Sequence, residues 1–422
     1  MDPEVYLQLG NLVRDKDRGD HSYLAYSDLY QPCDAYEQTY SWEDDFSGEE
    51  ESEVATAYRR ILRTAVARLD LLGYSLNQVR AMYEHERRRP SAFMNPRYQP
   101  PPRPPFDVIA ESIRLIDVSA VRPDHPRRGK GSPWAEAATG MLSLLKGDPT
   151  AGEHDRLRGW YEINITGLDP FTLLQMLARN PVNLDLPITW HAFNEIMYEY
   201  ASPQDIEVGA KRRDRFLIVT EGSSDTAVIK KALSLFRPHV ADFFDFIDMD
   251  KNYPLTGIGN LHNLYQGLLK IGILNNVLFI YDNDTEGTAK LAAASQLAAP
   301  GNVRIMKLPD MASFENFSTV GPTGEQPANI NGKAVSIECF LDLQWRTDRP
   351  SRVRWTGYHT GSGHYQGELE DKQAHVRRFL ALSPAEPTTY DTTKLNVLLD
   401  TILATCSGIA AARLNEDWLT SF

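Results

Sequence analysis

The fold is decided by Arg215-Phe-Leu-Ile-Val-Thr-Glu-Gly222 and Val277-Leu-Phe-Ile-Tyr-Asp-Asn-Asp-Thr-Glu-Gly287. Each stretch is a short apolar run of β-favouring residues that ends in carboxylates and a glycine, and a helical pattern begins just after it. In an open α/β fold the carboxyl ends of neighbouring parallel strands meet at one edge of the sheet. We therefore expect Glu221, Asp282 and Asp284 to converge at that edge. Grouped carboxylates are typical sites for hard cations such as Mg²⁺, which indicates metal-dependent chemistry on a phosphate.

Strands and helices alternate through this part of the chain. The predicted strands are 216–220, 243–247, 277–281 and 303–308, and the predicted helices are 226–235, 261–271 and 288–298. Such alternation favours parallel pairing with right-handed crossover connections. The sequence therefore predicts an α/β fold with an open sheet of about four parallel strands flanked by helices.

The acidic strand ends resemble the Toprim domain, which is shared by topoisomerases, bacterial primases and the OLD-type nucleases. The resemblance rests on Glu221-Gly222 after one strand and on Asp282-Asn283-Asp284 after a later one. Asp225 is more similar to the nuclease branch, and so is Ser336-Ile-Glu-Cys-Phe-Leu341. The resemblance covers about 211–345 and implies that Glu338 is a further metal-binding acid.

The five acids can be assigned to two metal positions. Two cations about 4 Å apart can neutralise a phosphodiester, activate a water and stabilise the leaving oxygen. We expect Glu221, Asp282 and Asp284 to bind metal directly, and Asp225 and Glu338 to complete a second position. Two readings stay open, because Glu221 could instead act as a general base and Asp284 could simply cap the following helix.

A lysine follows the fourth predicted strand. Lys307-Leu-Pro-Asp310 resembles the segment at this place in Toprim nucleases, where a lysine offsets phosphate charge. We count Lys307 among the catalytic candidates, although a solvent-facing strand end explains it equally well.

The chain divides into four predicted parts. They are 1–95, a mixed or helical domain with an acidic loop at 42–53; 96–210, a mostly helical region after a Pro-rich linker; 211–345, the Toprim-like part; and 346–422, a small α+β extension. Outside the Toprim-like part the predicted helices are 53–72, 75–88, 171–178, 190–197 and 395–412.

The rest of the chain resembles prokaryotic defence proteins that place a HEPN-type helical region before Toprim. The resemblance rests on Leu69-Asp-Leu-Leu-Gly73, Gly159-Trp160 and Asn316-Phe-Ser-Thr-Val-Gly-Pro-Thr-Gly324, with Lys372 after the core. Arg80-Ala-Met-Tyr-Glu-His85 matches the arginine–histidine spacing of HEPN ribonucleases, which implies a possible second site at Arg80 and His85. A scaffold or dimerisation surface is the preferred reading of this region.

Bulk properties permit a nucleic-acid enzyme. The 422 residues are 42% hydrophobic and carry a formal charge of −13, which is awkward for phosphate binding. Basic islands offset it locally, and the candidates for nucleic-acid contact are Arg87, Arg88, Arg89, Lys211, Arg212 and Arg213. A solvated surface explains any one island equally well. The three scattered cysteines, the absence of a signal peptide and the absence of a membrane-length apolar stretch predict a cytoplasmic protein.

The missing motifs narrow the function. The sequence has neither a phosphate-binding loop of ATPases nor a zinc-binding cysteine set. We therefore expect a nuclease that uses Mg²⁺ or Mn²⁺, with two ions, on DNA or RNA (transfer RNA included), in antiphage defence or abortive infection. We expect nucleic acid as a partner and no membrane. A defence-system partner protein and a homo-oligomer are further candidates. The alternatives are a metal-independent HEPN ribonuclease and a non-catalytic nucleic-acid-binding subunit of a defence complex.

Overall fold

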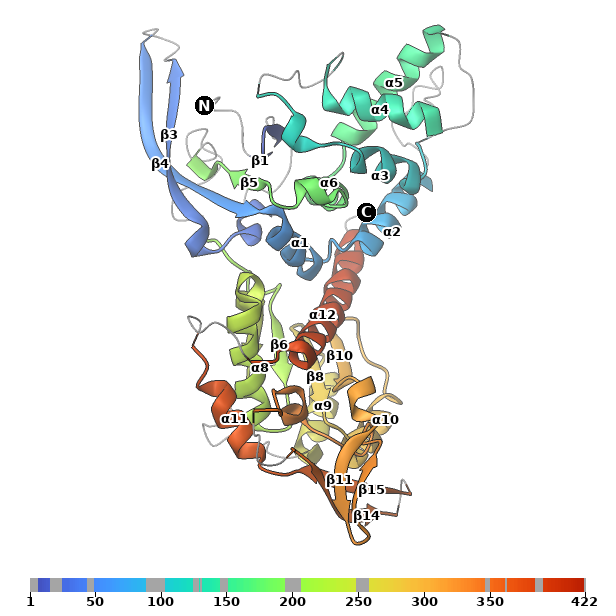
Figure 1. Cartoon of the computed structure of the whole chain (residues 1–422). Helices are drawn as coiled ribbons and strands as arrows, with labels where there is room; N and C mark the ends of the chain where they lie inside the picture. Colours follow the sequence, from blue (N-terminus) through green and yellow to red (C-terminus); the bar gives the residue numbers. More distant parts are fainter. Residues whose placement is uncertain are drawn as a thin grey trace. The chain divides into compact units, whose positions relative to one another are not determined.

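The computed structural model divides into two compact units, Met1–Ala210 and Lys211–Phe422 (Figure 1). The described residues are 7–15, 25–43, 49–88, 103–123, 129, 131–144, 151–193, 206–247, 258–345, 350–360, 363–383 and 390–420. Arg89 and most of the Pro-rich linker lie outside them. The division after residue 210 coincides with the start of the Toprim-like part.

The first unit contains a five-stranded antiparallel sheet, which the sequence analysis does not anticipate. The strands are β1 (Leu7–Leu9), β2 (Leu12–Asp15), β3 (Ala35–Glu43), β4 (Glu50–Ile61) and β5 (Pro187–Trp190), in the order β2-β1-β5-β4-β3. The pairing of β5 with β1 and β4 joins segments far apart in the chain. Tyr30 and Tyr58 stack on Trp190, with ring centroids 5.9 and 5.3 Å away, and this aromatic group lies on the sheet.

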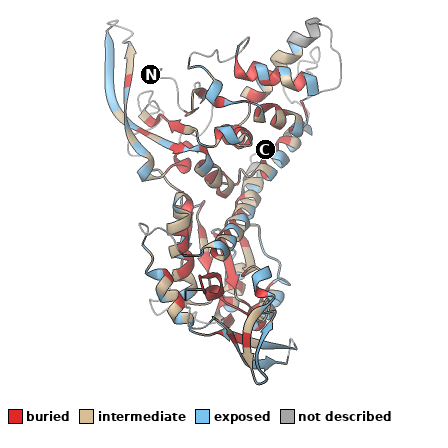
Figure 2. Cartoon of the chain, in the orientation of Figure 1, coloured by how far each residue is buried: buried red, intermediate tan, exposed pale blue. Residues whose placement is uncertain are grey.

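The predicted helix over 53–72 is wrong in its first half. Residues up to Ile61 form β4, which pairs with β3 from Ala35↔Tyr58 to Glu43↔Glu50, and helix α1 (Leu62–Leu71) begins only afterwards. Most side chains at the outer end of β4 are exposed (Figure 2), so no buried face marks this segment as a strand. The predicted acidic loop at 42–53 is likewise wrong at its ends, where it forms the facing arms of this hairpin.

Helices make up most of the rest of the described part of the first unit. They are α1, α2 (Leu76–Arg88), α3 (Phe106–Arg114), α4 (Pro133–Leu144), α5 (Ala151–Thr166) and α6 (Pro170–Leu177). The Asp169 side chain accepts hydrogen bonds from the backbone N–H groups of Phe171 and Thr172 and so caps α6. The predictions over 75–88 and 171–178 are confirmed by α2 and α6. The helix predicted over 190–197 is wrong at its start, because Trp190 ends β5, and residues beyond 193 lie outside the described part.

The second unit has the predicted α/β core. Its sheet contains β6 (Phe216–Val219), β7 (Phe244–Phe246), β8 (Asn276–Tyr281) and β10 (Val303–Lys307), all parallel, in the order β10-β8-β6-β7. The flanking helices are α8 (Ser223–Phe236), α9 (Ile258–Ile271) and α10 (Thr285–Ala294). Every residue of β8 is buried, as expected for a central parallel strand. The predicted four-stranded parallel sheet is therefore confirmed.

A smaller sheet adjoins this core. It contains β11 (Phe317–Gly321), β12 (Gly324–Ala328), β14 (Val353–His359) and β15 (His364–Leu369), in the order β12-β11-β14-β15. A short antiparallel pair joins β9 (Asn283–Asp284) to β13 (Ala334–Val335). The helices that follow are α11 (Lys372–Leu380) and α12 (Thr393–Thr420). One sheet thus contains strands from either side of residue 345.

Helix α12 corrects the expectation that no apolar stretch reaches membrane-spanning length. Its segment Thr393–Glu416 is long and apolar enough to cross a membrane by length and composition, with a mean hydropathy of 1.6. Core helices of soluble proteins pass the same test. Here α12 contacts α8, β8 and β10, and its fully buried side chains are Leu395, Leu398, Leu399, Ile402, Cys406, Ile409 and Ala410. Their apolar character is accounted for by packing on the sheet.

Candidate metal centre at the carboxyl edge of the parallel sheet

The structure brings the five predicted acids to one edge of the parallel sheet. Glu221 follows β6 and Asp225 lies in the first turn of α8, while Asp282 follows β8 and Asp284 precedes α10. Glu338 comes from a short 3-10 turn, Ile337–Phe340. We call these five residues the acid cluster. Burial and the charges of these carboxyl groups raise the pKa values of Glu221, Asp225 and Asp282.

Asp282 is the most strongly affected member of the acid cluster. Burial raises its pKa well above the usual range, and the charges of Asp225, Asp284, Glu221 and Glu338 raise it further. A buried carboxyl among like charges favours its protonated form unless a cation compensates the charge. A cation beside Asp282 would therefore be needed to keep its carboxylate ionised.

Glu221 and Asp225 show the same physical effect. Burial, followed by the charges of Asp284 and Glu286, raises the pKa of Glu221 to about 7. Burial, followed by the charge of Glu338, raises the pKa of Asp225 to about 7, against the hydrogen bond from the backbone of Gly222. Each of these carboxyls is thus near its titration point at neutral pH.

Local hydrogen bonds fix the orientation of Asp284. Its Oδ1 accepts from the backbone N–H of Gly287 at 2.7 Å, which caps α10. Its Oδ2 accepts from the side-chain amide of Gln366 in β15. The helix-cap reading of Asp284 is therefore correct, and the capping role coexists with its membership of the acid cluster. Gln366 is a supporting residue that local sequence patterns did not reveal.

Two other members of the acid cluster are held in a similar way. The backbone N–H of Gly222 donates to Asp225 Oδ2 at 3.0 Å. The Ser336 hydroxyl donates to Glu338 Oε2 at 2.6 Å, and the Glu338 side chain is buried. Each of these bonds limits the rotation of the carboxylate, and the bond from Gly222 also lowers the pKa of Asp225 against the effect of burial.

The donor set suits a hard cation. All five side chains offer carboxylate oxygens, the ligands that Mg²⁺ and Mn²⁺ prefer, and neighbouring like charges disfavour an empty site. Among the described residues no three carboxyl, imidazole or thiol groups stand close enough to hold a metal ion together. This is compatible with Mg²⁺, which keeps several waters and is usually held by one or two carboxylates together with substrate phosphates.

Removal of metal should give an unusual pH dependence of stability. Because the folded-state pKa values of Glu221 and Asp225 are raised to about 7, the folded state binds more protons than the unfolded state between about pH 4 and 7. Stability in EDTA should therefore fall as pH rises from 5.5 to 8. We expect Tm to drop by several degrees, since about 1 kcal/mol moves the Tm of such a domain by about 2–4 °C. Differential scanning calorimetry measures it.

The Asp282→Asn variant is the matched comparison, because it removes one carboxyl of raised pKa from the acid cluster at nearly constant volume. Its Tm in EDTA should fall less over the same pH range. Added Mg²⁺ at pH 8 should raise the Tm of the wild type by mass action and that of the variant much less. Identical pH profiles for the two proteins would show that the acid cluster is not the origin of the effect.

Lys372 is a basic residue that the candidate set omits. Its Nζ lies 3.3 Å from Glu368 Oε1, at the start of α11. Although burial lowers the pKa of Lys372, the charges of Glu338, Glu368 and Asp282 raise it overall. Lys372 thus places a positive charge beside the acid cluster. It lies too far along the chain from the predicted core for strand-end patterns to identify it.

Lys307 has different partners. Its ammonium donates to Asp310 Oδ1 at 2.7 Å and to Asn283 Oδ1 at 2.9 Å. Asn283 also donates to Asp310 Oδ1 at 2.8 Å and accepts from the backbone N–H of Gly332 at 2.9 Å. This network fixes the chain beside Asp282 and Asp284. The contacts of Lys307 support a structural role more directly than phosphate binding.

The predicted basic islands belong to different units. In the first unit Arg87 forms an ion pair with Glu84 at 2.8 Å and Arg88 is exposed. In the second unit Arg212 and Arg213 are exposed, and Arg213 Nε lies 3.6 Å from Asp214. Lys211 is half-buried. Neither island contacts the acid cluster through a bond between described residues.

The HEPN candidate pair lies on α2. Arg80 forms an ion pair with Asp107 at 2.6 Å, and its guanidinium stacks over the Phe106 ring at 4.9 Å. His85 is exposed. Arg80 is thus engaged in packing α2 against α3, which agrees with the scaffold reading.

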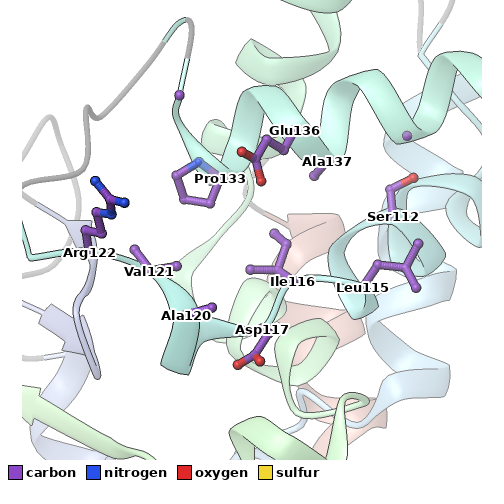
Figure 3. A pocket seen from close by; sticks show the side chains of 12 residues that line it. Ser112, Leu115, Ile116, Asp117, Ala120, Val121, Arg122, Pro133, Glu136 and Ala137 are labelled. Carbon is purple, nitrogen blue, oxygen red and sulfur yellow. The ribbon is translucent and has the colours of Figure 1, made fainter.

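A cavity of about 640 Å³ lies in the first unit, between α3 and α4 (Figure 3). Its lining includes Leu115, Ile116, Asp117, Val121, Arg122, Pro133 and Glu136. None of the sequence-predicted site residues lines it, and its apolar floor lacks the grouped acids of the parallel-sheet edge. The candidate chemistry therefore resides in the second unit.

The two units define a mixed α/β protein with acids grouped at a parallel-sheet edge. Comparison with family models matches residues 1–214 to HEPN/Toprim N-terminal domain 1. The chain therefore belongs to this HEPN/Toprim family, and the membership indicates a nuclease-like or defence role. No curated protein and no solved structure matches the chain.

Proposed function

We propose that this protein is a metal-dependent nuclease that hydrolyses phosphodiester bonds in DNA or RNA, with Mg²⁺ or Mn²⁺ as cofactor. The observation that carries the proposal is the convergence of the acid cluster at the carboxyl edge of the parallel sheet, where open α/β folds bind their ligands. Membership of the HEPN/Toprim family supports a nuclease activity in general.

The acid cluster would supply the ligands for two ions. Glu221, Asp282 and Asp284 would hold one ion, and Asp225 and Glu338 would complete a second position. Bound cations would supply charge neutralisation on the phosphate and a water of lowered pKa. The raised pKa values of Asp282 and Asp225 describe the metal-free protein; a bound cation would favour the ionised carboxylates.

Proton transfer and charge neutralisation would fall to two of the chain's own residues. In the alternative role Glu221 would not bind the ion, and its carboxyl, with a pKa of about 7, would take a proton from the attacking water near neutral pH. Lys372 would offset negative charge on the phosphate oxygens from the α11 side. Its ion pair with Glu368 orients the ammonium at the edge of the acid cluster.

Membership of the family supports a proposal about the biological setting. We propose that the nuclease acts in the cytoplasm in antiphage defence, by abortive infection, with transfer RNA among its candidate substrates. A defence-system partner protein and self-association are part of the same proposal. The first unit would then serve as a scaffold or dimerisation surface, in accordance with the structural role of Arg80.

The test is a cleavage assay with the purified full chain on plasmid, single-stranded DNA and total transfer RNA. We expect cleavage with Mg²⁺ or Mn²⁺ and its loss in EDTA, because the cations neutralise the phosphate and activate the water. Gel electrophoresis measures the extent of cleavage and shows which of the three nucleic acids is the substrate. Cleavage that persists in EDTA would transfer the chemistry to Arg80 and His85, and no cleavage under any condition would favour a non-catalytic subunit.

A further inference from the structure

An open groove of about 620 Å³ lies in the second unit, between the β14–β15 hairpin and the start of α11. Four cationic side chains line it, Arg352, Arg354, Lys372 and Arg377, together with the acids Glu368, Glu370 and Asp371. The lining therefore has a net charge of +1, in a chain whose total charge is −13. A protein of that net charge needs such a local surface to bind a polyanion.

The groove continues into the acid cluster. Gln366 and Glu368 are two residues apart on β15, so their side chains lie on the same face of the strand. Gln366 donates to Asp284 within the acid cluster, and Glu368 pairs with Lys372 in the groove. Lys372 belongs to both places, since the charges of Glu338 and Asp282 act on it. One face of the hairpin therefore connects the groove to the acids.

The groove arginines are held in place with donors to spare. Glu370 accepts from Arg352 Nε at 2.6 Å and also forms an ion pair with Arg354, whose side chain is 59% exposed. The contact of Arg377 is through its Nε to the backbone carbonyl of Gln373 at 3.2 Å. Arg352 also forms an ion pair with Glu325. For Arg354 and Arg377 a single carboxylate or carbonyl partner leaves several of the five guanidinium N–H donors for a phosphate.

From this arrangement we infer that the groove binds the phosphate backbone of the nucleic-acid strand beside the point of cleavage. Arg354 and Arg377 contact phosphates of the nucleic-acid strand, and Lys372 lies where the groove meets the acid cluster. The ion pair with Glu370 holds the guanidinium of Arg354 in position for contact with a phosphate. The inference rests on the proposed function and names the surface that would position its substrate.

The test measures binding separately from cleavage. The full chain with Asp282→Asn and Asp284→Asn serves as a non-cleaving background, and fluorescence anisotropy with labelled single-stranded and duplex oligonucleotides in Mg²⁺ gives Kd as a function of salt. Adding Arg354→Ala and Arg377→Ala should weaken binding about tenfold. It should also lower the magnitude of the slope of log K against log salt by about one to two. Fewer counterions are released on binding when two phosphate contacts are lost.

Two further variants sharpen the test. Arg377→Glu alone should weaken binding, and because Arg377 is exposed and contacts only a carbonyl it should leave folding intact. The matched control is Arg304→Ala in β10, whose guanidinium also binds only backbone carbonyls, and its Kd should stay within about twofold of the background.

The outcomes separate this inference from the proposed function. Equal Kd and salt slope for the background and the groove variants would overturn the inference even if the wild type cleaves, and so would a background protein that binds neither oligonucleotide. Failure of the wild type to cleave, with groove-dependent binding intact, would count against the proposed nuclease activity alone. A stronger effect on the single strand than on the duplex would assign the groove to single-stranded substrates.

Discussion

The Asp282→Asn, Asp284→Asn variant should lose cleavage by about 10³-fold or more. The two carboxylates would hold the cation that stabilises the developing charge, a contribution of several kcal/mol, and each 1.36 kcal/mol corresponds to a factor of ten in rate. Asparagine keeps the volume of both side chains, and its amide oxygen can keep the cap on the N–H of Gly287. Initial rates in Mg²⁺ with the cleaved substrate measure the loss.

Folding and chemistry separate cleanly in this variant. Replacing a buried carboxyl that is surrounded by like charges should leave Tm in EDTA at pH 8 unchanged or higher. The matched control is Asp245→Ala in β7 of the same sheet, where the exposed carboxylate lies 3.7 Å from Arg215; its rate should stay within about threefold of wild type. Full activity of the asparagine double variant would contradict the proposed metal centre.

The parallel core was predictable because its signals are local. Each buried strand is a short apolar run, and the acids stand directly at its end, as Glu221 and Asp282 do. The rule that parallel strand ends share one sheet edge then places acids from separate strands together. Asp284 shows that one side chain can satisfy two readings, since it caps α10 and belongs to the acid cluster.

The sheet of the first unit was not predictable in the same way. Its strand β4 is mostly exposed, so its residues lack the alternating pattern of a half-buried strand, and the apolar spacing of α1 obscured the boundary at Ile61. Its pairing with β5 depends on Tyr58↔Trp190, a contact between distant parts of the chain. Such non-local pairing leaves little trace in a local pattern.

The supporting residues of the candidate site follow the same rule. Gln366 and Lys372 reach the acid cluster from β15 and α11, elements that follow the parallel core in the chain and pack back on α10 and α8. Lys307, in contrast, was selected from its place after a strand, and the structure engages it with Asp310 and Asn283. Proximity in sequence to a strand end was enough to group the acids, whereas the role of Lys307 in catalysis stays a prediction.

Gly287→Ala should damage stability and activity together. A Cβ at this position would lie 2.2 Å from the backbone oxygen of Asp282 and 3.1 Å from Asp284 Oδ1. A backbone atom cannot rotate away, so the peptide after β8 must shift. We expect a loss of about 1–3 kcal/mol in the free energy of unfolding, typical of overpacking. A displacement near 1 Å at the acids should lower the cleavage rate by about 10²-fold. Urea unfolding and initial rates measure the two effects.

Gly267→Ala is the control with the opposite expected sign. Gly267 lies inside α9, and a Cβ there would have no atom within 4 Å. Alanine is a better helix former by about 1 kcal/mol, so this variant should be more stable than wild type and equally active. If Gly287→Ala were as stable and active as Gly267→Ala, the close approach of α10 to Asp282 would not be what positions the acids. The paired substitutions thus test whether the turn between β8 and α10 sets the geometry of the candidate metal centre.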